Sequence, residues 1–188
     1  FKLRLGWDTS GPDAETWRIL APELAGLGAG WLTLHPRTAK QGFSGSARHS
    51  ALKELKALVS IPVVASGDLM CAEDGIRCIW ETGVDTVMYA RGALRDPGIF
   101  TAHRILWNGG IPEKTSVSAI LDRIRHHAHL ATKLTSDRAA LLKMRTIVPR
   151  YVHDIEGVKQ LRLEVIACRN WEDFEAALQR FAAFHGLS

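Results

Sequence analysis

Long apolar runs are absent from this sequence, and so is a leader-like start. No stretch approaches the ~18 consecutive apolar residues that suggest a membrane span, so we expect no membrane association. The first residues, Phe1-Lys2-Leu3-Arg4, do not place charge ahead of a longer apolar segment, as a secretory signal does. Low-complexity segments are also missing. With 46% hydrophobic and 23% charged residues, the composition favours a folded chain over a disordered one.

Cysteine is scarce, and its pattern excludes two classes of protein. Cys71, Cys78 and Cys168 are an odd number, and no pair has the C-x-x-C spacing of metal and redox motifs. The set therefore argues against a disulfide framework and predicts reduced thiols in a cytoplasmic protein. We predict no metal site.

Basic residues gather in the second part of the chain. Residues 1–100 hold 11 Lys or Arg and 11 Asp or Glu, whereas residues 101–188 hold 13 and 9, which accounts for the net charge of +4. Within residues 123–169 there are 10 basic and 4 acidic residues. This asymmetry favours contact between the second part and a polyanion. A solvated helical face with a chance excess of arginine would leave the same pattern.

A βα unit recurs through the first hundred residues. Short β-rich segments return every 24 to 31 residues, and each is followed by apolar residues at helical spacing. Strands that alternate with helices predict a parallel sheet with right-handed crossovers, so the fold class is α/β. The predicted strands are Phe1–Leu5, Trp31–His35, Ile61–Ser66 and Thr86–Ala90, and the predicted helices cover residues 17–27, 52–59 and 73–82.

The strand pattern stops after Pro97, and helical stripes replace it. Apolar spacing predicts helices over residues 117–131, 141–152 and 171–184. Thr115 or Ser116 is the natural N-cap of the first, and Asn170 that of the last. A turn at residues 108–112 separates the two patterns. The sequence thus predicts an α/β domain over residues 1–107 and an all-α helical domain over residues 113–188.

Unusual polar residues follow each predicted strand at its carboxyl end. In a parallel sheet or barrel this is the edge where ligands bind. Gly67 and Gly92 stand where backbone amides could approach a phosphate closely. Each feature alone fits a solvated strand end, a structural histidine or a turn, but four at equivalent positions favour a binding site. The residues are Lys2, Arg4 and Gly6, then His35-Pro36-Arg37-Thr38, Ser66-Gly67-Asp68 and Ala90-Arg91-Gly92-Ala93.

These motifs, in this order and at these separations, resemble the tRNA-dihydrouridine synthase family over nearly the whole chain. The resemblance implies the C-terminal half of a TIM (β/α)8 barrel, that is, four βα units, followed by an all-α helical domain. The matching segments are Lys2-Leu3-Arg4-Leu5-Gly6-Trp7, His35-Pro36-Arg37-Thr38, Gly42-Phe43-Ser44-Gly45, Ser66-Gly67-Asp68, Ala90-Arg91-Gly92-Ala93, Lys143-Met144-Arg145, Tyr151 and Arg162.

The resemblance also implies an FMN cofactor, NADPH as the reductant, and uridine in tRNA as the substrate reduced at its C5–C6 bond. By that likeness Lys2 and His35 line the isoalloxazine ring, where donors stabilise the negative charge of a reduced flavin. Phosphate contacts come from Arg91 with the Gly92 amide. The cofactor residues expected in this way are Lys2, His35, Ser66, Gly67, Asp68, Ala90, Arg91 and Gly92.

On the RNA side, the resemblance places Arg37 and the Gln41–Ser44 loop at the cleft. In the second domain we expect Lys143, Arg145 and Arg150 to contact tRNA, whose backbone phosphates attract basic side chains. Arg145 lies near the edge of the apolar stripe, which favours a place at a cleft between the domains.

The sequence departs from the family pattern in three ways. Pro36 stands where the family often has glycine, and Ser66 where asparagine is common. The family's first four βα units have no counterpart, and with them the cysteine that acts as general acid is missing. We therefore predict no catalytic residue here and an inactive chain by itself, since four strands need the N-terminal half of the barrel for closure.

Alternatives remain open at this stage. Another phosphate-binding TIM-barrel enzyme, such as a small-molecule flavin oxidoreductase or a phosphosugar isomerase, would have no use for the basic helical part. A non-catalytic RNA-binding module would use Arg145 and its neighbours without a flavin. An inert truncation is the third alternative.

Overall fold

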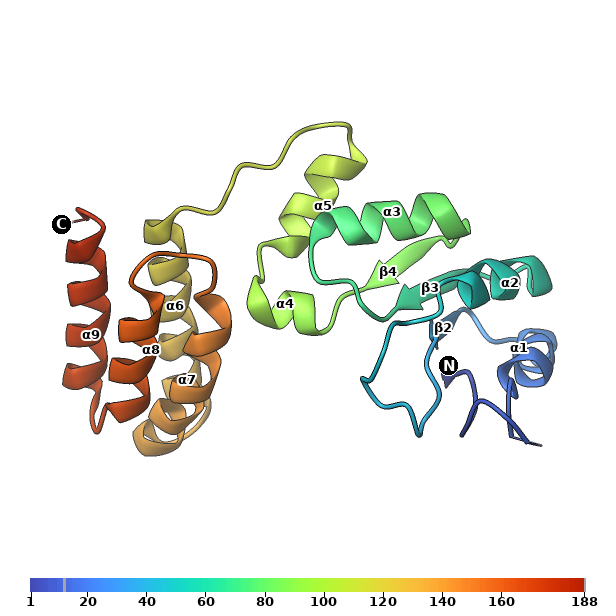
Figure 1. Cartoon of the computed structure of the whole chain (residues 1–188), viewed down its shortest axis with the longest axis horizontal. Helices are drawn as coiled ribbons and strands as arrows, with labels where there is room; N and C mark the ends of the chain where they lie inside the picture. The colour runs from blue at the N-terminus through green and yellow to red at the C-terminus, as the bar shows by residue number, and fades with distance from the viewer. Residues whose placement is uncertain (12, 188) are drawn as a thin grey trace. The chain divides into compact units, whose positions relative to one another are not determined.

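The computed structural model describes residues 1–11 and 13–187, which form two compact units (Figure 1). The first unit contains Phe1–Ala93 and Ile99–Pro112, and the second contains Leu94–Gly98 and the chain from Glu113 onward. Each unit has its own hydrophobic core. The short segment Leu94–Gly98 thus packs with the second unit although the α/β pattern surrounds it in the sequence.

A parallel sheet forms the centre of the first unit and confirms the predicted α/β class. Its strands are β1 (Lys2–Arg4), β2 (Leu32–His35), β3 (Val63–Ser66) and β4 (Thr86–Met88). Each strand pairs with the next along the chain, in the order β1-β2-β3-β4. Sequential parallel pairing is the arrangement that repeated βα units produce, and it is consistent with part of a barrel.

Helices cover one face of this sheet. Figure 1 shows α2 (Ser50–Leu58) and α3 (Ala72–Thr82) beside the strands, in contact with β3 and β4 respectively. The unit also contains α1 (Trp17–Gly26), α5 (Ile99–Trp107) and the first residues, Arg91–Ala93, of α4 (Arg91–Arg95). Side chains alternate along a strand, so Leu32 and Leu34 enter the core with Val63 and Ala65. The intervening side chains, including His35 and Ser66, point to the other face.

The second unit is built from α6 (Val117–Leu134), α7 (Asp137–Tyr151), α8 (Val158–Ala167) and α9 (Trp171–Phe184). Their apolar faces share one core, in which Ile124, Met144 and Leu178 are fully buried. The hydroxyl of Ser116 and the side-chain oxygen of Asn170 accept backbone N–H groups at the starts of α6 and α9. These are the N-caps that the sequence indicates.

Three helices lie where no helix was predicted, namely the very short α4, then α5 and α8. The sequence Pro97-Gly98 predicts an end to regular secondary structure. However, α5 begins directly after it and packs along α3. Helix α8 lacks a polar N-cap, because Gly157 fills that position with a φ of 75°. All three helices are short, and their apolar spacing was too brief to stand out from a loop pattern.

Candidate functional site

A cavity of about 250 Å³ opens at the carboxyl edge of the sheet in the first unit. It brings together every residue predicted for the cofactor except Gly92. Seven of the eight predicted cofactor residues therefore share one cavity. The lining residues are Lys2, Arg4, His35, Phe43, Ser66, Gly67, Asp68, Leu69, Met70, Met88, Ala90 and Arg91.

Strand register explains why residues far apart in sequence meet here. Arg4 of β1 lies opposite His35 of β2, and Ser66 of β3 lies opposite Met88 of β4. All four side chains belong to the face that the helices leave uncovered. Since the strands are parallel, the loops that follow them extend the same edge. The cavity is therefore formed by the ends of all four strands of the described sheet.

Asp68 is the centre of a hydrogen-bond network at this edge. Its carboxylate accepts from the guanidinium of Arg37 at 2.6 and 2.8 Å, from the Ala47 N–H at 2.7 Å and from Arg91 at 2.9 Å. Burial raises the pKa of the Asp68 carboxyl, but the bonds from Arg37 and Ala47 and the charges of Arg37 and Arg91 outweigh it, so the pKa is lowered overall. Asp68 is thus an anion that joins the loop after β2 to the loop after β4.

Arg37 lies inside the protein, with 1% of its side chain exposed. Its guanidinium also donates to the backbone oxygens of Ser44 and Gly45. The Nε atom of Arg37 is buried and has no acceptor among the described residues. In this position the guanidinium orders the Ser44–Gly45 turn and does not face outward, so the expected contact between Arg37 and RNA gains no support from its surroundings.

Arg91 is an exposed cation at the site. Its side chain is 44% exposed, and its guanidinium carbon lies 4.8 Å from the centre of the Phe43 ring. The contact with Phe43 and the bond to Asp68 hold the guanidinium at the rim of the cavity. A guanidinium in this place can bind an incoming anion by exchanging its hydrogen bond to Asp68 for hydrogen bonds to the anion.

Two glycines allow close backbone packing around the cavity. A Cβ atom on Gly67, whose φ is 110°, would lie 2.8 Å from the His35 ring. A Cβ on Gly92 would lie 2.6 Å from the backbone oxygen of Leu69 and 2.9 Å from that of Met70. Gly92 is buried and does not line the cavity. Its observed role is to let the start of α4 pack against the segment after β3.

The electrostatic surroundings keep His35 uncharged. Burial, helped by the nearby charges of Arg4, Lys2 and Arg37, lowers the pKa of its ring to about 4. Burial also lowers the pKa of Lys2, and the charge of Arg4 adds to this. The described lining holds several cations and one carboxylate, Asp68, which is already bonded to two arginines. The cavity therefore suits a ligand that carries negative charge.

Sequence reasoning missed several residues that line the cavity. Met88 was detectable, because it shares a strand face with Thr86 and points toward the same edge as Ala90. Phe43 lies in a loop, and no periodic signal could place its ring against Arg91. Leu69 and Met70 follow the Ser66-Gly67-Asp68 motif directly, so extending that motif by two residues would have found them.

None of the residues expected to contact RNA is among those that line this cavity. Lys143 and Arg150 are exposed on α7. Arg145 is half-buried and lines a groove formed entirely by residues of the second unit.

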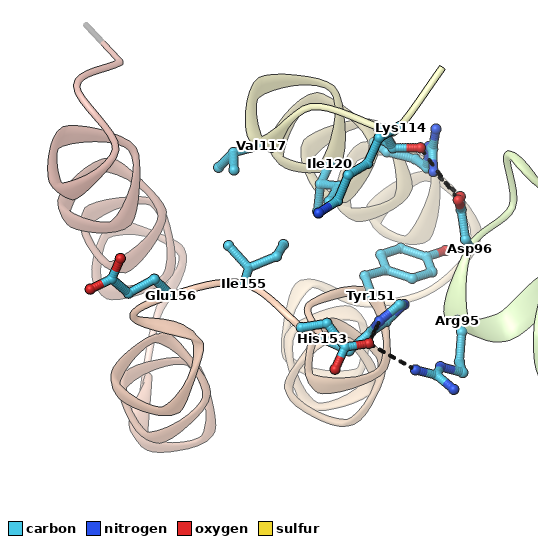
Figure 2. Close-up of a pocket in the computed structure, with 12 residues that line it drawn as sticks. Arg95, Asp96, Lys114, Val117, Ile120, Tyr151, His153, Ile155 and Glu156 are labelled. Carbon is cyan, nitrogen blue, oxygen red and sulfur yellow. Dashed lines mark hydrogen bonds and ion pairs between the residues drawn. The ribbon is translucent and has the colours of Figure 1, made fainter. Parts of the chain in front are cut away.

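A second cavity, of about 440 Å³, lies within the second unit (Figure 2). In this view Val117, Ile120 and Ile155 gather on one side, and Arg95 and Asp96 lie on the other. Its charged groups mostly pair with one another: Asp96 with Arg123, and Asp154 with His153 at 2.9 Å and with Arg95 at 3.7 Å. Paired charges leave little to attract a charged ligand, and we assign this cavity no function.

No activated thiol occurs in the described part of the chain. Burial raises the pKa of the Cys71 thiol to about 11, and burial also raises the pKa of Cys78 and of Cys168. Within residues 1–11 and 13–187, no group of His, Cys, Asp and Glu has the arrangement of a metal site. In the same residues, no helix is both long and apolar enough to cross a membrane.

Comparison with known proteins identifies the family. The profile described as "Dihydrouridine synthase (Dus)" matches residues 1–185. The chain belongs to the dihydrouridine synthase family. The family resemblance predicted from the strand-end motifs is thereby confirmed.

Curated relatives support the same assignment. A probable tRNA-dihydrouridine synthase 1 from Synechocystis is 34% identical over 86% of this chain and 44% of its own length. A probable tRNA-dihydrouridine synthase from Aquifex aeolicus is 29% identical over 92% of this chain and 52% of its own length. A tRNA-dihydrouridine synthase B from Xanthomonas axonopodis is 34% identical over 67% of this chain and 37% of its own length. The chain spans about half the length of the Synechocystis and Aquifex relatives.

Proposed function

We propose that this chain is the cofactor-binding part of a tRNA-dihydrouridine synthase that uses FMN and NADPH and acts on tRNA in the cytoplasm. One observation carries the proposal. Residues predicted from four strand ends and from the family resemblance line a single cavity, whose charged groups are mostly basic, in a member of the dihydrouridine synthase family. When bound, FMN would supply hydride transfer from NADPH to the C5–C6 bond of a uridine.

The residues present fit part of this cofactor. The cavity volume of about 250 Å³ is below the ~300–1,000 Å³ of complete small-molecule sites. Such a volume agrees with a site to which a further part of the barrel contributes. The close approaches at Gly67 and Gly92, which a Cβ would block, are typical of loops shaped around a ligand.

Individual side chains then have distinct roles. Arg91 would bind the phosphate by exchanging its bond to Asp68 for bonds to phosphate oxygens. Lys2 and neutral His35 would donate hydrogen bonds to the edge of the isoalloxazine ring. Ser66, Gly67 and Ala90 would surround the ribityl chain. Asp68 would keep the two loops in place, with Arg37 as its buried partner.

One element of the activity, the general acid, lies outside the roles that these residues can fill. None of Cys71, Cys78 and Cys168 lines the cavity, and the latter two are buried elsewhere. We therefore propose that the general acid belongs to an N-terminal half of the barrel. That half would also pair with the open edges at β1 and β4.

Flavin binding tests the proposal. The chain would be joined to the N-terminal half of a family member, and the FMN dissociation constant would be measured by fluorescence quenching. We expect a yellow protein, and about ten- to hundredfold weaker binding for Lys2→Ala or Arg91→Ala, since a hydrogen bond to a charged group contributes about 1.5–3 kcal/mol. Lys53→Ala, an exposed lysine on α2, is the matched control. A colourless fusion that binds tRNA would contradict the flavin site and support an RNA-binding module.

A further inference from the structure

The side chain of Tyr89 lies on the face of the sheet opposite the cofactor cavity. Tyr89 follows β4 directly, between Met88 and Ala90, and both of these neighbours line the cavity. Since side chains alternate along an extended chain, Tyr89 points away from the cavity, and its ring is buried in the core of the first unit. Because only Ala90 separates Tyr89 from Arg91, the position of the Tyr89 ring limits where the Arg91 backbone can lie.

The Tyr89 hydroxyl joins two helices that pack side by side, α3 and α5 (Figure 1). It lies 2.7 Å from Nδ1 of His103 on α5 and 3.3 Å from the backbone oxygen of Ala72, the first residue of α3. Both bonds form together when His103 carries its proton on Nδ1, since the ring then donates to the hydroxyl and the hydroxyl donates to Ala72. The Tyr89 ring also meets the rings of His103 and Phe100 edge to face, with centres 5.7 and 5.9 Å apart. Both helices therefore hold this side chain.

Helix α3 has a glycine at the point where this hydroxyl lies. A Cβ on Gly75 would overlap the Tyr89 hydroxyl and would lie 3.1 Å from Nδ1 of His103. Glycine is unfavourable in the interior of a helix, so its presence there indicates that the space it leaves is needed. The packing of α3 against α5 is thus shaped around the tyrosine–histidine pair.

Helix α5 also contacts the segment that carries Arg91. A Cβ on Gly92 would lie 3.0 Å from Cδ1 of Ile99, the buried first residue of α5. Ile99 and His103 are four residues apart, so they lie on the same face of the helix. This face of α5 therefore meets residues 89–92 at both ends, through His103 at Tyr89 and through Ile99 at Gly92.

Neither member of the pair carries a charge at neutral pH. Burial raises the pKa of the Tyr89 phenol, and nearby acidic groups of α3 add to this, whereas burial lowers the pKa of the His103 ring. Neither residue lines the cofactor cavity. Any effect of the pair on a ligand in that cavity must therefore act through the position of the residues beside it in the chain.

We propose that Tyr89 and His103 are positioning residues, whose hydrogen bond sets where Arg91 presents its guanidinium to the phosphate of FMN. The inference rests on the proposed function, in which Arg91 binds that phosphate. A pair that served only the stability of the core would change the affinity for every part of the flavin alike. A positioning pair changes the affinity for the phosphate group and leaves the contacts of the ring system in place.

The test compares FMN with riboflavin, which has no phosphate, in the chain joined to the N-terminal half of a family member. Fluorescence quenching gives both dissociation constants, and their ratio reports the phosphate contacts. We expect Tyr89→Phe to weaken FMN binding about three- to tenfold, a part of the loss expected for Arg91→Ala, and to change riboflavin binding by less than about twofold. His103→Leu should have the same effect. His103→Gln, whose amide can still bond to the hydroxyl, should restore most of the ratio.

Tyr151→Phe is the matched control. Tyr151 is the other tyrosine of the chain, and its hydroxyl lies 2.8 Å from Nδ1 of His127 in the second unit. The substitution removes the same kind of bond and should leave the ratio of the two dissociation constants unchanged.

An equal rise of both dissociation constants in Tyr89→Phe, or an unchanged affinity for FMN, would overturn the inference and leave the flavin proposal standing. Combining Tyr89→Phe with His103→Leu should weaken FMN binding no more than either change alone, because both remove one bond. Fully additive effects would show that the two residues do not act as a pair. The two His103 variants repeat the comparison with the core tyrosine intact. An unaltered fusion that binds neither flavin would contradict the proposed function and this inference together.

Discussion

Asp68 has a positive φ of 56° and a carboxylate that serves three partners at once. An aspartate tolerates this backbone region better than most residues because its short side chain bonds locally. The strained conformation places the carboxylate between the loop after β2 and the side chain of Arg91. At the level of single residues, the site is therefore organised by an anion, even though the charged residues that line it are mostly basic.

We predict that Asp68→Asn destabilises the chain by on the order of 3 kcal/mol, because the buried guanidinium of Arg37 loses its counter-charge. Urea unfolding followed by circular dichroism measures this. The pKa of Asp68 is lowered by folding, so its contribution is present above its ordinary value of 3.8 and is lost as the pH falls through the lower folded value.

The control for this prediction is Glu54→Gln. Glu54 pairs with Arg18 in a half-exposed position, so its removal should cost much less stability. If both variants unfold at the same urea concentration, Arg37 and Asp68 do not form the buried pair described here.

His35 provides a prediction about pH. The unfolded chain takes up a proton on this ring near 6.5, whereas the folded chain does so only near 4. The unfolded state thus binds more protons between these values, and the histidine's contribution to stability is lost as the pH falls below 6.5. NMR titration should show the His35 ring signals unchanged from pH 8 to pH 5.5.

Arg4→Met is the companion variant, since among the nearby charges Arg4 lowers the pKa of His35 most. It should raise the pKa of the His35 ring. Full protonation of His35 at pH 6 in the unaltered chain would show that the ring is not buried among these cations.

At the level of the elements, α4 and the segment after β3 must approach each other closely. Gly92→Ala would place a Cβ against the backbone oxygens of Leu69 and Met70, which cannot move without shifting the loop. We predict a loss of about 1–3 kcal/mol in unfolding free energy, together with weaker flavin binding by the fused protein. Thermal unfolding and a flavin titration measure the two effects.

Gly30→Ala is the control for that substitution, because a Cβ on Gly30 meets no atom within 4 Å. It should leave both the unfolding free energy and flavin binding unchanged. Equal effects of the two alanines would mean that the close approach at Gly92 is not what shapes the loop.

The repeated βα pattern made the parallel sheet and most of its helices predictable. The strand ends then made the location of the cavity predictable, because parallel strands bring their carboxyl ends to one edge of the sheet. The buried position of the Arg37 side chain was not predictable from the sequence. Its motif stands beside His35, which lines the cavity, but its side chain turns inward to Asp68, a partner 31 residues away. A sequence shows that a residue is basic, but it does not show whether a carboxylate far away in the sequence pairs with that residue in the folded chain.

The same limit applied to the basic second unit. Ten basic residues between positions 123 and 169 suggested a polyanion, but only the ion pairs of the folded chain separate bound arginines, such as Arg125, from unpaired ones, such as Arg138. Helix α8 shows a related limit for fold prediction, because a glycine start leaves no capping signal in the sequence.

At the scale of the whole molecule, the two units have separate tasks in this account: the sheet unit holds the flavin, and the helical unit holds RNA. The family match spans both units, and the matched relatives are about twice as long as this chain. Under the proposed function, the synthase reaction belongs to a complete barrel, to which the present sheet would contribute the phosphate-binding end.

The most direct test is the formation of dihydrouridine itself. The chain, joined to the N-terminal half of a family member, would be incubated with FMN, NADPH and an unmodified tRNA transcript, and the digested nucleosides analysed by mass spectrometry. The account predicts a uridine that gains two hydrogens, lost on Arg91→Ala and retained with Lys53→Ala. A fusion that binds FMN and tRNA yet leaves every uridine unreduced, while the intact family member reduces its own under the same conditions, would contradict it.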